Sequence, residues 1–476
     1  MKKLLAITSS ALTMLSLQFY LHLNIIKPSG GHSGIEYLAL SVALGAIVIF
    51  PSLLISKSYR WIQKPTALLI VFWLFVFYKF AYEHPDRGLL FASSIGSSGG
   101  IIFFFFIGSL LGLNPLVSGS SSSIKIISSS AYRSSKSLYD FLKVFALSIV
   151  AMNSTVLSLI EFSFYSSKIR ADIFFVDSRL IGGDIPYQRI GDFLSINLLI
   201  SVLSTGVVLF SNYGIQGKSV AGMRLYLCSI FCSICALISC VLCFFTALLA
   251  GSNKGALLSA CILFLLICLF YLKRKNHILM LVSSTRKLLD SIQKFRIKKR
   301  FVWVVSISAT LSVLLGISTF LINPDLLKGT RLSRFGADDG ILGPRIRLLV
   351  ENFIDQFNVA PLLGHSFADG LTTGDGSYIH SLPVYLLIHT GLVGLILFFL
   401  FFYSHVRNKV IFINKCLTYP NPSVDLVRNL IGLYTIICAL CIAIIGTSLF
   451  WGFLWFGIGL SFAQSGLLRQ KQLDCN

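Results

Sequence analysis

Residues 380–403 have the sequence HSLPVYLLIHTGLVGLILFFLFFY, and this stretch decides what kind of protein the chain forms. After the polar pair His380-Ser381 the side chains are almost all apolar, over about the 20 residues that cross the hydrocarbon core of a bilayer. A helix is expected, because lipid cannot bond to backbone groups and the run is too long and evenly apolar for a barrel strand. The stretch therefore predicts a transmembrane helix with a polar mouth.

The same pattern recurs along the chain, in which 55% of the residues are hydrophobic and only 12% are charged. This composition excludes a soluble globular chain. About 12 apolar runs approach the length of a membrane span. They cover residues 4–26, 36–56, 66–83, 95–113, 138–163, 193–212, 225–250, 255–272, 301–322, 379–403, 429–447 and 449–468. No internal repeat is visible, so the sequence predicts an all-α integral membrane protein with one polytopic domain over residues 1–476.

Lysine and arginine set the orientation of these spans. Most of them lie in the segments on the same side of the membrane as the N-terminus, which places both termini in the cytoplasm. The formal net charge of +21 follows mainly from this bias. Because no basic patch is interleaved with aromatic residues outside the membrane-flanking segments, nucleic acid is not an expected partner. No cysteine falls in a predicted outward loop, so no disulfide framework is expected.

Two outward loops, residues 164–192 and 323–378, are longer than the other connections and rich in basic side chains. Loops of this length between helices are usually functional or disordered. In the second loop, apolar residues at helical spacing from Arg345 to Phe357 predict an amphipathic helix on the membrane surface, before the tenth span. Among the basic side chains of these loops are Arg179, Arg189, Arg345 and Arg347.

The polar mouth of the tenth span has a definite expected geometry. Ser381 can cap the helix that follows it. At about 100° per residue, Gly391 and Gly394 fall near the azimuth of His380, and two glycines would let a neighbouring helix approach closely. His389 falls on the opposite side, where a packing role is expected. His380 could accept a proton at the water-facing end of this seam, or it could be an interfacial residue that only anchors the helix.

The spacing of this motif resembles that of a known family. His380-Ser381, nine residues and then Gly391-Leu392-Val393-Gly394 is similar to the signature of the bacterial O-antigen ligases and the related O-antigen polymerases. Upstream, Arg345, an amphipathic stretch and Pro361-Leu362-Leu363-Gly364 resemble the family's arginine, helix and Pro-x-x-Gly arrangement. The likeness covers about residues 179–468, with a signature region at 343–468.

Of the two basic segments, one resembles the family pattern and the other departs from it. The segment from Arg179 to Arg189, which leads into a hydrophobic run, is similar to the family's basic segment before a core helix. The upstream arginine departs from the family pattern, since Pro344 separates Gly343 from Arg345 and no tryptophan follows. Arg345 and Arg347 therefore compete for one role.

The resemblance implies a C-type glycosyltransferase-like membrane fold in a bacterial inner (cytoplasmic) membrane, with the active face in the periplasm. The implied donor is a glycan linked to undecaprenyl pyrophosphate. The implied acceptor is lipid A-core for a ligase, which we favour slightly, or another lipid-linked glycan for a polymerase. Arginine forks suit pyrophosphate oxygens, and a neutral His380 suits the role of base toward the acceptor hydroxyl. Pro361, Gly364, Ser381, Gly391 and Gly394 would form the structural part of the motif.

The expected reaction is a metal-independent, inverting displacement without a cofactor. The acids of the loop before His380 are not paired as Asp-x-Asp, and the chain has no P-loop or dinucleotide fingerprint. The alternative from another class is a polysaccharide or lipid transporter (a flippase). Transporters tend to place ionisable residues deep within spans, whereas Lys79 and Glu161 lie near predicted helix ends.

Overall fold

The structure is a computed structural model, and it describes ten of the 12 expected spans in whole or in part. The described residues are 2–26, 63–83, 101–113, 116, 130–170, 187–211, 220–250, 252–282, 360–365, 381–417, 424–446 and 451–466. The predicted spans at 36–56 and 301–322 lie outside them, as does most of the loop at 323–378.

These segments form helices and, within the described ranges, no strands. The helices are α1 (Lys2–Ile26), α3 (Gln63–Glu83), α5 (Ile101–Leu113), α6 (Ser130–Arg170), α7 (Tyr187–Phe210), α8 (Val220–Leu249), α9 (Asn253–Val282), α12 (Leu382–Leu417), α13 (Val424–Gly446) and α14 (Gly452–Gly466). Each overlaps one predicted apolar run, which confirms the all-helical prediction. Six of them, α6 to α9, α12 and α13, contain a segment long and apolar enough to cross a membrane. The chain is therefore a multi-pass membrane protein, and the total of about 12 spans stays a prediction.

α6 extends beyond its apolar run at both ends, and its last turns occupy residues 164–170 of the predicted outward loop. Serine hydroxyls support this extension by bonding to carbonyls of the preceding turn. Ser166 donates to Phe162 O (2.7 Å) and Ser167 donates to Phe164 O (2.8 Å). Apolar length marks the thickness of the hydrocarbon, whereas helical hydrogen bonding continues into the polar region, so the run underestimates the helix.

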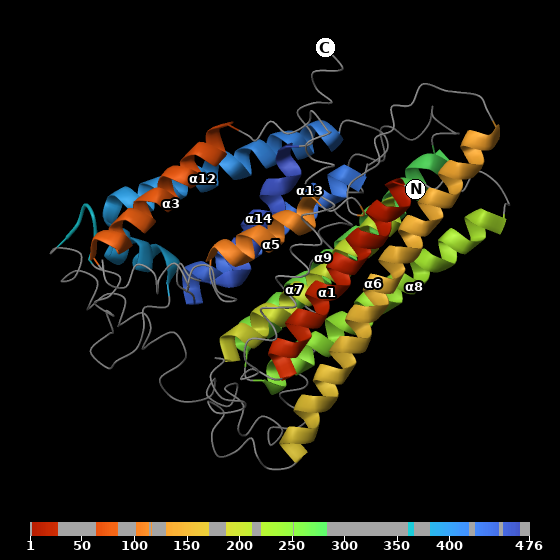
Figure 1. Cartoon of the computed structure of the whole chain (residues 1–476), viewed down its shortest axis with the longest axis horizontal. Helices are drawn as coiled ribbons and strands as arrows, with labels where there is room; N and C mark the ends of the chain where they lie inside the picture. The colour runs from red at the N-terminus through yellow and green to blue at the C-terminus, as the bar shows by residue number, and fades with distance from the viewer. Residues whose placement is uncertain are drawn as a thin grey trace.

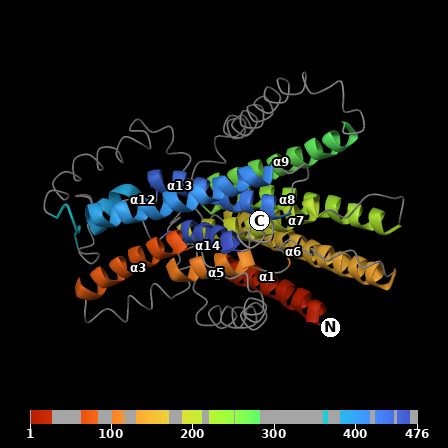
Figure 2. The same cartoon turned by 90° about the horizontal axis from the view of Figure 1, so that it is seen from above.

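α7 lies at the centre of the helix bundle. In its span Ile190–Phe210, 94% of the residues are buried, compared with 33% in the span Tyr226–Leu249 of α8. α7 packs against α1, α6, α8, α9, α13 and α14. Figures 1 and 2 show α7 inside the molecule, with α6 and α8 toward one side and α3 and α12 toward the other. Small polar residues such as Ser201 and Ser204, both fully buried, permit this close packing.

α5 and α14 cross with their backbones in direct contact. A methyl group on Gly108 would lie 2.1 Å from Phe456 O, and one on Gly459 would lie 2.1 Å from Phe105 O. Ser109 adds a hydrogen bond to Gly459 O (3.3 Å). Without a hydrophobic driving force between helices in lipid, such backbone contact is the main source of association. The pair holds α14 against the centre of the bundle, where it also contacts α7 and α13.

Several helix termini meet at one end of the bundle. Ser381 Oγ donates to Ile444 O at the end of α13 (2.8 Å), which joins the start of α12 to α13. Trp451, next to the start of α14, donates from Nε1 to Asp192 Oδ1 in the first turns of α7 (2.6 Å). We call this the Ser381 end of the bundle. It gathers the segments that flank the residues singled out in the sequence.

Candidate functional site

α12 is bent at Gly391, whose φ of 61° and ψ of −166° lie outside the helical region. A residue without a Cβ adopts this conformation freely, which is why the break falls on a glycine. The predicted azimuths of Gly391 and Gly394 relative to His380 assumed unbroken steps of about 100° per residue, and this assumption is wrong at Gly391. The azimuth relative to His380, which lies outside the described residues, stays a prediction. The element that approaches Gly391 is not a helix but a turn from the preceding loop.

That turn consists of residues 360–365, and its backbone replaces the hydrogen bonds that α12 loses. In an unbroken helix the carbonyls of residues 388 and 389 would accept from the amides of residues 392 and 393. The bonds observed instead run from His365 N to Ile388 O (2.6 Å), from Leu392 N to Pro361 O (3.0 Å) and from Val393 N to Leu362 O (3.2 Å). Since unpaired backbone groups are costly in an apolar environment, the turn makes the break tolerable.

The close contact explains the glycines of both motifs. Gly364 has a φ of 74°, and a Cβ on it would lie 2.6 Å from Gly391 N. A Cβ on Gly391 would lie 2.2 Å from Leu362 O. Each glycine is thus required twice, by its own backbone conformation and by the backbone facing it. The Pro-x-x-Gly turn and the Gly-x-x-Gly stretch form one contact unit, although no local sequence pattern indicates their proximity.

Gly394 lies where the second half of α12 packs against α3. A Cβ there would lie 2.2 Å from Thr390 Oγ1 and 3.1 Å from Phe75 of α3. Thr390 is fully buried and donates to Leu386 O (2.6 Å), which covers a carbonyl next to the break. Gly394 therefore permits two contacts at once, one within α12 and one with α3.

Ser381 fixes the mouth of α12. The helix begins at Leu382 as predicted, and Ser381 O accepts from Tyr385 N (2.8 Å). The Ser381 hydroxyl donates to Ile444 O of α13, so it joins two helices where a cap within α12 was expected. His389 is 3% exposed, and its ring lies 4.3 Å from the ring of Tyr385. This placement agrees with the packing role expected for that histidine.

Lys79 of α3 also belongs to this site, and the sequence analysis assigned it no role. It is buried, and its ammonium group donates to His365 O (2.5 Å) and to His389 O. The first carbonyl belongs to the turn and the second to the first half of α12. A charged side chain in an apolar helix was the available signal, but its partners are backbone atoms of distant segments, which no local pattern reveals.

Asp192 and Trp451 form a second link that the sequence analysis did not assign. Their hydrogen bond joins α7 to α14, and the two side chains are 5% and 6% exposed. Asp192 follows Arg189 by three residues, in the first turns of α7. An aspartate directly before the predicted run at 193–212 is the signal that could have identified it, because an acidic residue within a span, here Ile190–Phe210, almost always has a partner.

The predicted substrate-binding and catalytic residues are only partly placed. Arg189 lies in the first turn of α7, which starts at the Ser381 end. His380, Arg179, Arg345 and Arg347 lie outside the described residues. The structure therefore brings together the motif residues Pro361, Gly364, Gly391 and Gly394, and it leaves their relation to the arginines as a prediction. Within the described ranges, no three His, Cys, Asp or Glu side chains gather as a possible metal site.

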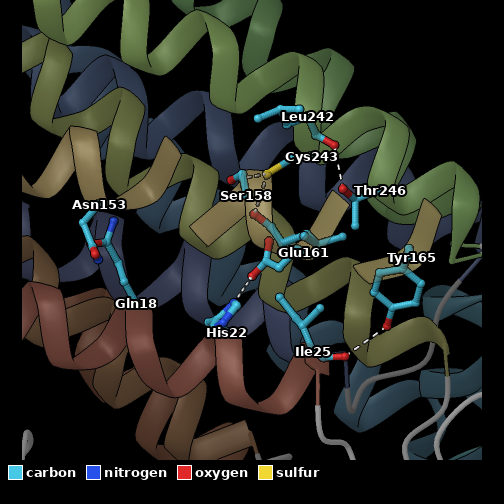
Figure 3. A network of polar contacts seen from close by, with 11 residues as sticks. Gln18, His22, Ile25, Asn153, Ser158, Glu161, Tyr165, Leu242, Cys243 and Thr246 are labelled. Carbon is cyan, nitrogen blue, oxygen red and sulfur yellow. Dashed lines mark hydrogen bonds and ion pairs between the residues drawn. The ribbon is translucent and has the colours of Figure 1, made fainter. Parts of the chain in front are cut away.

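A further polar network joins α1, α6 and α8 (Figure 3). His22 Nδ1 lies 3.2 Å from Glu161 Oε1, and Glu161 is fully buried within the span of α6. Along α6, Asn153 lies two turns before Glu161 and donates from Nδ2 to Gln18 Oε1 (2.8 Å), and Tyr165 lies one turn after it and donates to Ile25 O (3.0 Å). Glu161 was expected near a helix end, but the extension of α6 places it inside the span.

The comparisons with known proteins agree with the motif. Residues 238–399 match the protein-family model described as O-antigen ligase. The matched range contains the contact unit of the 360–365 turn with Gly391, and it also contains His380, Arg345 and Arg347. No curated protein and no solved structure matches the chain. The match over residues 238–399 confirms the resemblance of this chain to the O-antigen ligase and polymerase family.

Proposed function

We propose that the protein is a bacterial inner-membrane glycan transferase. In this proposal it moves an O-antigen-type glycan from undecaprenyl pyrophosphate to a sugar hydroxyl at the periplasmic face, with lipid A-core as the favoured acceptor. The observation that carries the proposal is the family match over residues 238–399, which spans the motif around His380. The contact between the turn and the kinked α12 supports it, because the two motif halves that flank His380 in sequence are neighbours in space.

The chemistry proposed for the site is an in-line displacement at the anomeric carbon of the donor. The acceptor oxygen forms the new glycosidic bond while the bond from that carbon to the pyrophosphate oxygen breaks. His380 takes the proton of the acceptor hydroxyl, and undecaprenyl pyrophosphate leaves as an anion. Arg179, Arg189 and one of Arg345 and Arg347 neutralise its developing charge. Because pyrophosphate is a good leaving group, the donor side needs charge stabilisation more than a general acid.

The test of the catalytic step is transfer by the purified His380→Ala variant, which we expect to insert normally and to transfer no glycan. His389→Phe is the matched control, since it keeps an aromatic ring against Tyr385 and should keep wild-type transfer. Transfer by His380→Ala at the wild-type rate would remove the proposed base.

The test of donor binding is direct measurement of lipid-pyrophosphate affinity for the glutamine variants of the four arginines. Loss of one charge-assisted contact should weaken donor binding by roughly ten- to hundredfold, and acceptor binding much less. Lysine replacements should recover only part of the loss, because a point charge cannot reproduce a bidentate fork. Only one of Arg345 and Arg347 is expected to matter. Unchanged affinity in all four variants contradicts the proposed leaving-group site.

The orientation is tested by labelling. A cysteine at Ser377 should react with a membrane-impermeant thiol reagent added from the periplasmic side, whereas a cysteine at Ser404 in the second half of α12 should not. The reverse pattern would place the Ser381 end in the cytoplasm and contradict a periplasmic active face.

A polymerase is the second candidate within the same class, and it uses the same donor with a different acceptor. Complementation separates the two. Restoration of long glycan on lipid A-core in a ligase-null strain supports the ligase, whereas conversion of single repeats to long chains in a polymerase-null strain supports the polymerase. We expect the first result.

A transporter is the candidate from another class, and one observation favours it: Glu161 is a fully buried carboxylate within a span. Proteoliposomes decide between the classes. A transferase forms the new glycosidic bond with donor and acceptor on the same side of the bilayer. A flippase moves lipid-linked glycan across the bilayer and forms no such bond.

A further inference from the structure

The break in α12 leaves a precise set of backbone groups to be satisfied. An unbroken helix would pair the amides of Leu392 and Val393 with the carbonyls of Ile388 and His389. The turn at 360–365 takes over both amides and one of the carbonyls. Of these four backbone groups, His389 O is the one that forms no hydrogen bond with the turn. Lys79 donates to it from α3, and so completes the exchange of hydrogen bonds.

The same ammonium group also reaches the turn. Lys79 Nζ donates to His365 O at 2.5 Å, and His365 is the last described residue of the turn. The Lys79 ammonium group therefore bridges the 360–365 turn and the first half of α12. Two carbonyl dipoles that converge on a buried ammonium are the kind of partners that make its burial possible. Lysine suits this position because a compact ammonium on a flexible stem can donate to two carbonyls at once.

The bridge lies at one end of the segment that carries the candidate base, and the contact of Ser381 with α13 lies at the other. In the chain, residues 366–380 connect His365 to Ser381. His365 is held by Lys79 and by Ile388 O, and Ser381 is held by Ile444 O. Whatever path the connecting residues take, both of its end points are fixed by these contacts.

We propose that Lys79 is a positioning residue for glycan transfer, acting through the backbone of His365 and His389. This inference rests on the proposed function in its catalytic consequence, while the contact itself can be tested without any transfer assay. Lys79 touches no reacting atom in this proposal. Its loss should loosen the 360–365 turn from α12 and slow the chemical step, because small misplacement of a catalytic group sharply lowers the rate.

The first experiment measures backbone hydrogen exchange of the full-length protein in nanodiscs, by mass spectrometry of peptides that contain His365 and Leu392. Lys79→Met removes the donors and keeps the length of the side chain. We expect at least about tenfold faster exchange at these amides, equal to about 1.4 kcal/mol of local opening. Lys409→Met is the matched control. Lys409 is also buried, in the far half of α12, and donates to Asn429 Oδ1 (2.8 Å), so its loss should leave exchange at His365 unchanged.

The second experiment measures kcat and the donor KM for the same variants. With Lys79→Met, kcat should fall at least about tenfold while the donor KM stays within about twofold, since binding residues are untouched. Lys79→Arg keeps the charge and several donors, so it should recover part of both kcat and exchange protection. If Lys79→Met does not fold, Lys79→Arg is used instead. Its kcat should be lower and its exchange faster than in wild type, each by less than the roughly tenfold change expected for complete loss of the Lys79 contacts.

The outcomes are distinct. Unchanged exchange in Lys79→Met, or in Lys79→Arg if that variant is used, overturns the bridge. Faster exchange with wild-type kcat overturns the positioning role, and the proposed function survives if His380→Ala remains inactive. If the wild-type protein transfers no glycan, the proposed function and the catalytic role of Lys79 both fail, and the exchange experiment still decides the bridge.

Discussion

The kink of α12 and the seam between α1 and α6 solve the same problem in opposite ways. Both place polar groups inside a protein whose surroundings are apolar. At the seam the helices are regular, and side chains such as His22 and Glu161 pair with each other. At the kink the polar groups are backbone amides and carbonyls, exchanged between α12 and a distant turn.

The difference indicates where disruption is most harmful. A side-chain bond within a membrane contributes about 0.6 kcal/mol on average and up to about 2 kcal/mol, because the separated helices find other partners. A backbone break has no such alternative: it depends on conformations open only to Gly364 and Gly391 and on the facing backbone. We therefore expect the kink to be much less tolerant of substitution than the seam.

The largest effect is expected for Gly391→Ala. The new Cβ would lie 2.2 Å from Leu362 O, and alanine disfavours the local backbone conformation, so a loss of more than about 3 kcal/mol is expected. Equilibrium unfolding in mixed detergent micelles measures it. The control is Gly206→Ala in α7, whose Cβ would meet only side-chain ends, the nearest at 3.2 Å. Equal losses in both variants would contradict the special status of the kink.

A smaller loss, about 2 kcal/mol, is expected for Trp451→Phe, because the buried Asp192 carboxylate loses a charge-assisted hydrogen bond. The phenyl ring retains packing against Phe453. Trp73→Phe is the matched control, since Trp73 Nε1 has no hydrogen-bond partner among the described residues. Unfolding free energies of the two variants should differ clearly. If Trp451→Phe lost as much unfolding free energy as Gly391→Ala, side-chain hydrogen bonds would matter as much for stability as the backbone contacts at the kink.

The seam itself is tested by a double-mutant cycle between His22→Phe and Glu161→Gln. Because the two side chains are in contact, we expect a coupling free energy of about 1 kcal/mol. Asn153→Leu, two turns away on α6 and bonded to Gln18, provides the reference, and its effect should add to that of Glu161→Gln. Coupling near zero between His22 and Glu161 would mean that their proximity stabilises nothing.

The smallest effect is expected for Ser381→Ala, which removes one neutral hydrogen bond between α12 and α13 and should cost about 1 kcal/mol. Ser204→Ala is the comparison, since its hydroxyl bonds only to Ile200 O of the same helix (2.9 Å). Unfolding of both variants under identical conditions measures the difference. A smaller loss for Ser381→Ala than for Ser204→Ala would remove its role as a link between helices.

The sequence alone predicted the described helices and the resemblance to the family, because both depend on residues close together in the chain. The predicted span at 193–212 coincides with most of α7, because apolar length is a property of consecutive residues. The motif at His380-Ser381 also lies within one stretch of chain, and the family match includes it.

The kink of α12 and the partners of Lys79 could not be predicted, because they depend on contacts between segments that are distant in the chain. Gly391 lies in an apolar run where a glycine usually serves helix packing, and only Pro361 and Leu362 across the break distinguish a kink. Lys79 was placed near a helix end correctly, but its acceptors are carbonyls of His365 and His389, which have no side-chain signature. Backbone partners cannot be identified from residue type, and this is where sequence reasoning stopped.

The bridge made by Lys79 has a consequence for biogenesis. Its two acceptors lie 286 and 310 residues further along the chain, so α3 enters the membrane long before either carbonyl has been synthesised. During that interval the ammonium group must extend toward the headgroups, as lysines near helix ends do. Burial of Lys79 is therefore a late step of assembly, and a nascent chain that ends before the turn at 360–365 leaves Lys79 without the two carbonyls that hold it in the finished protein.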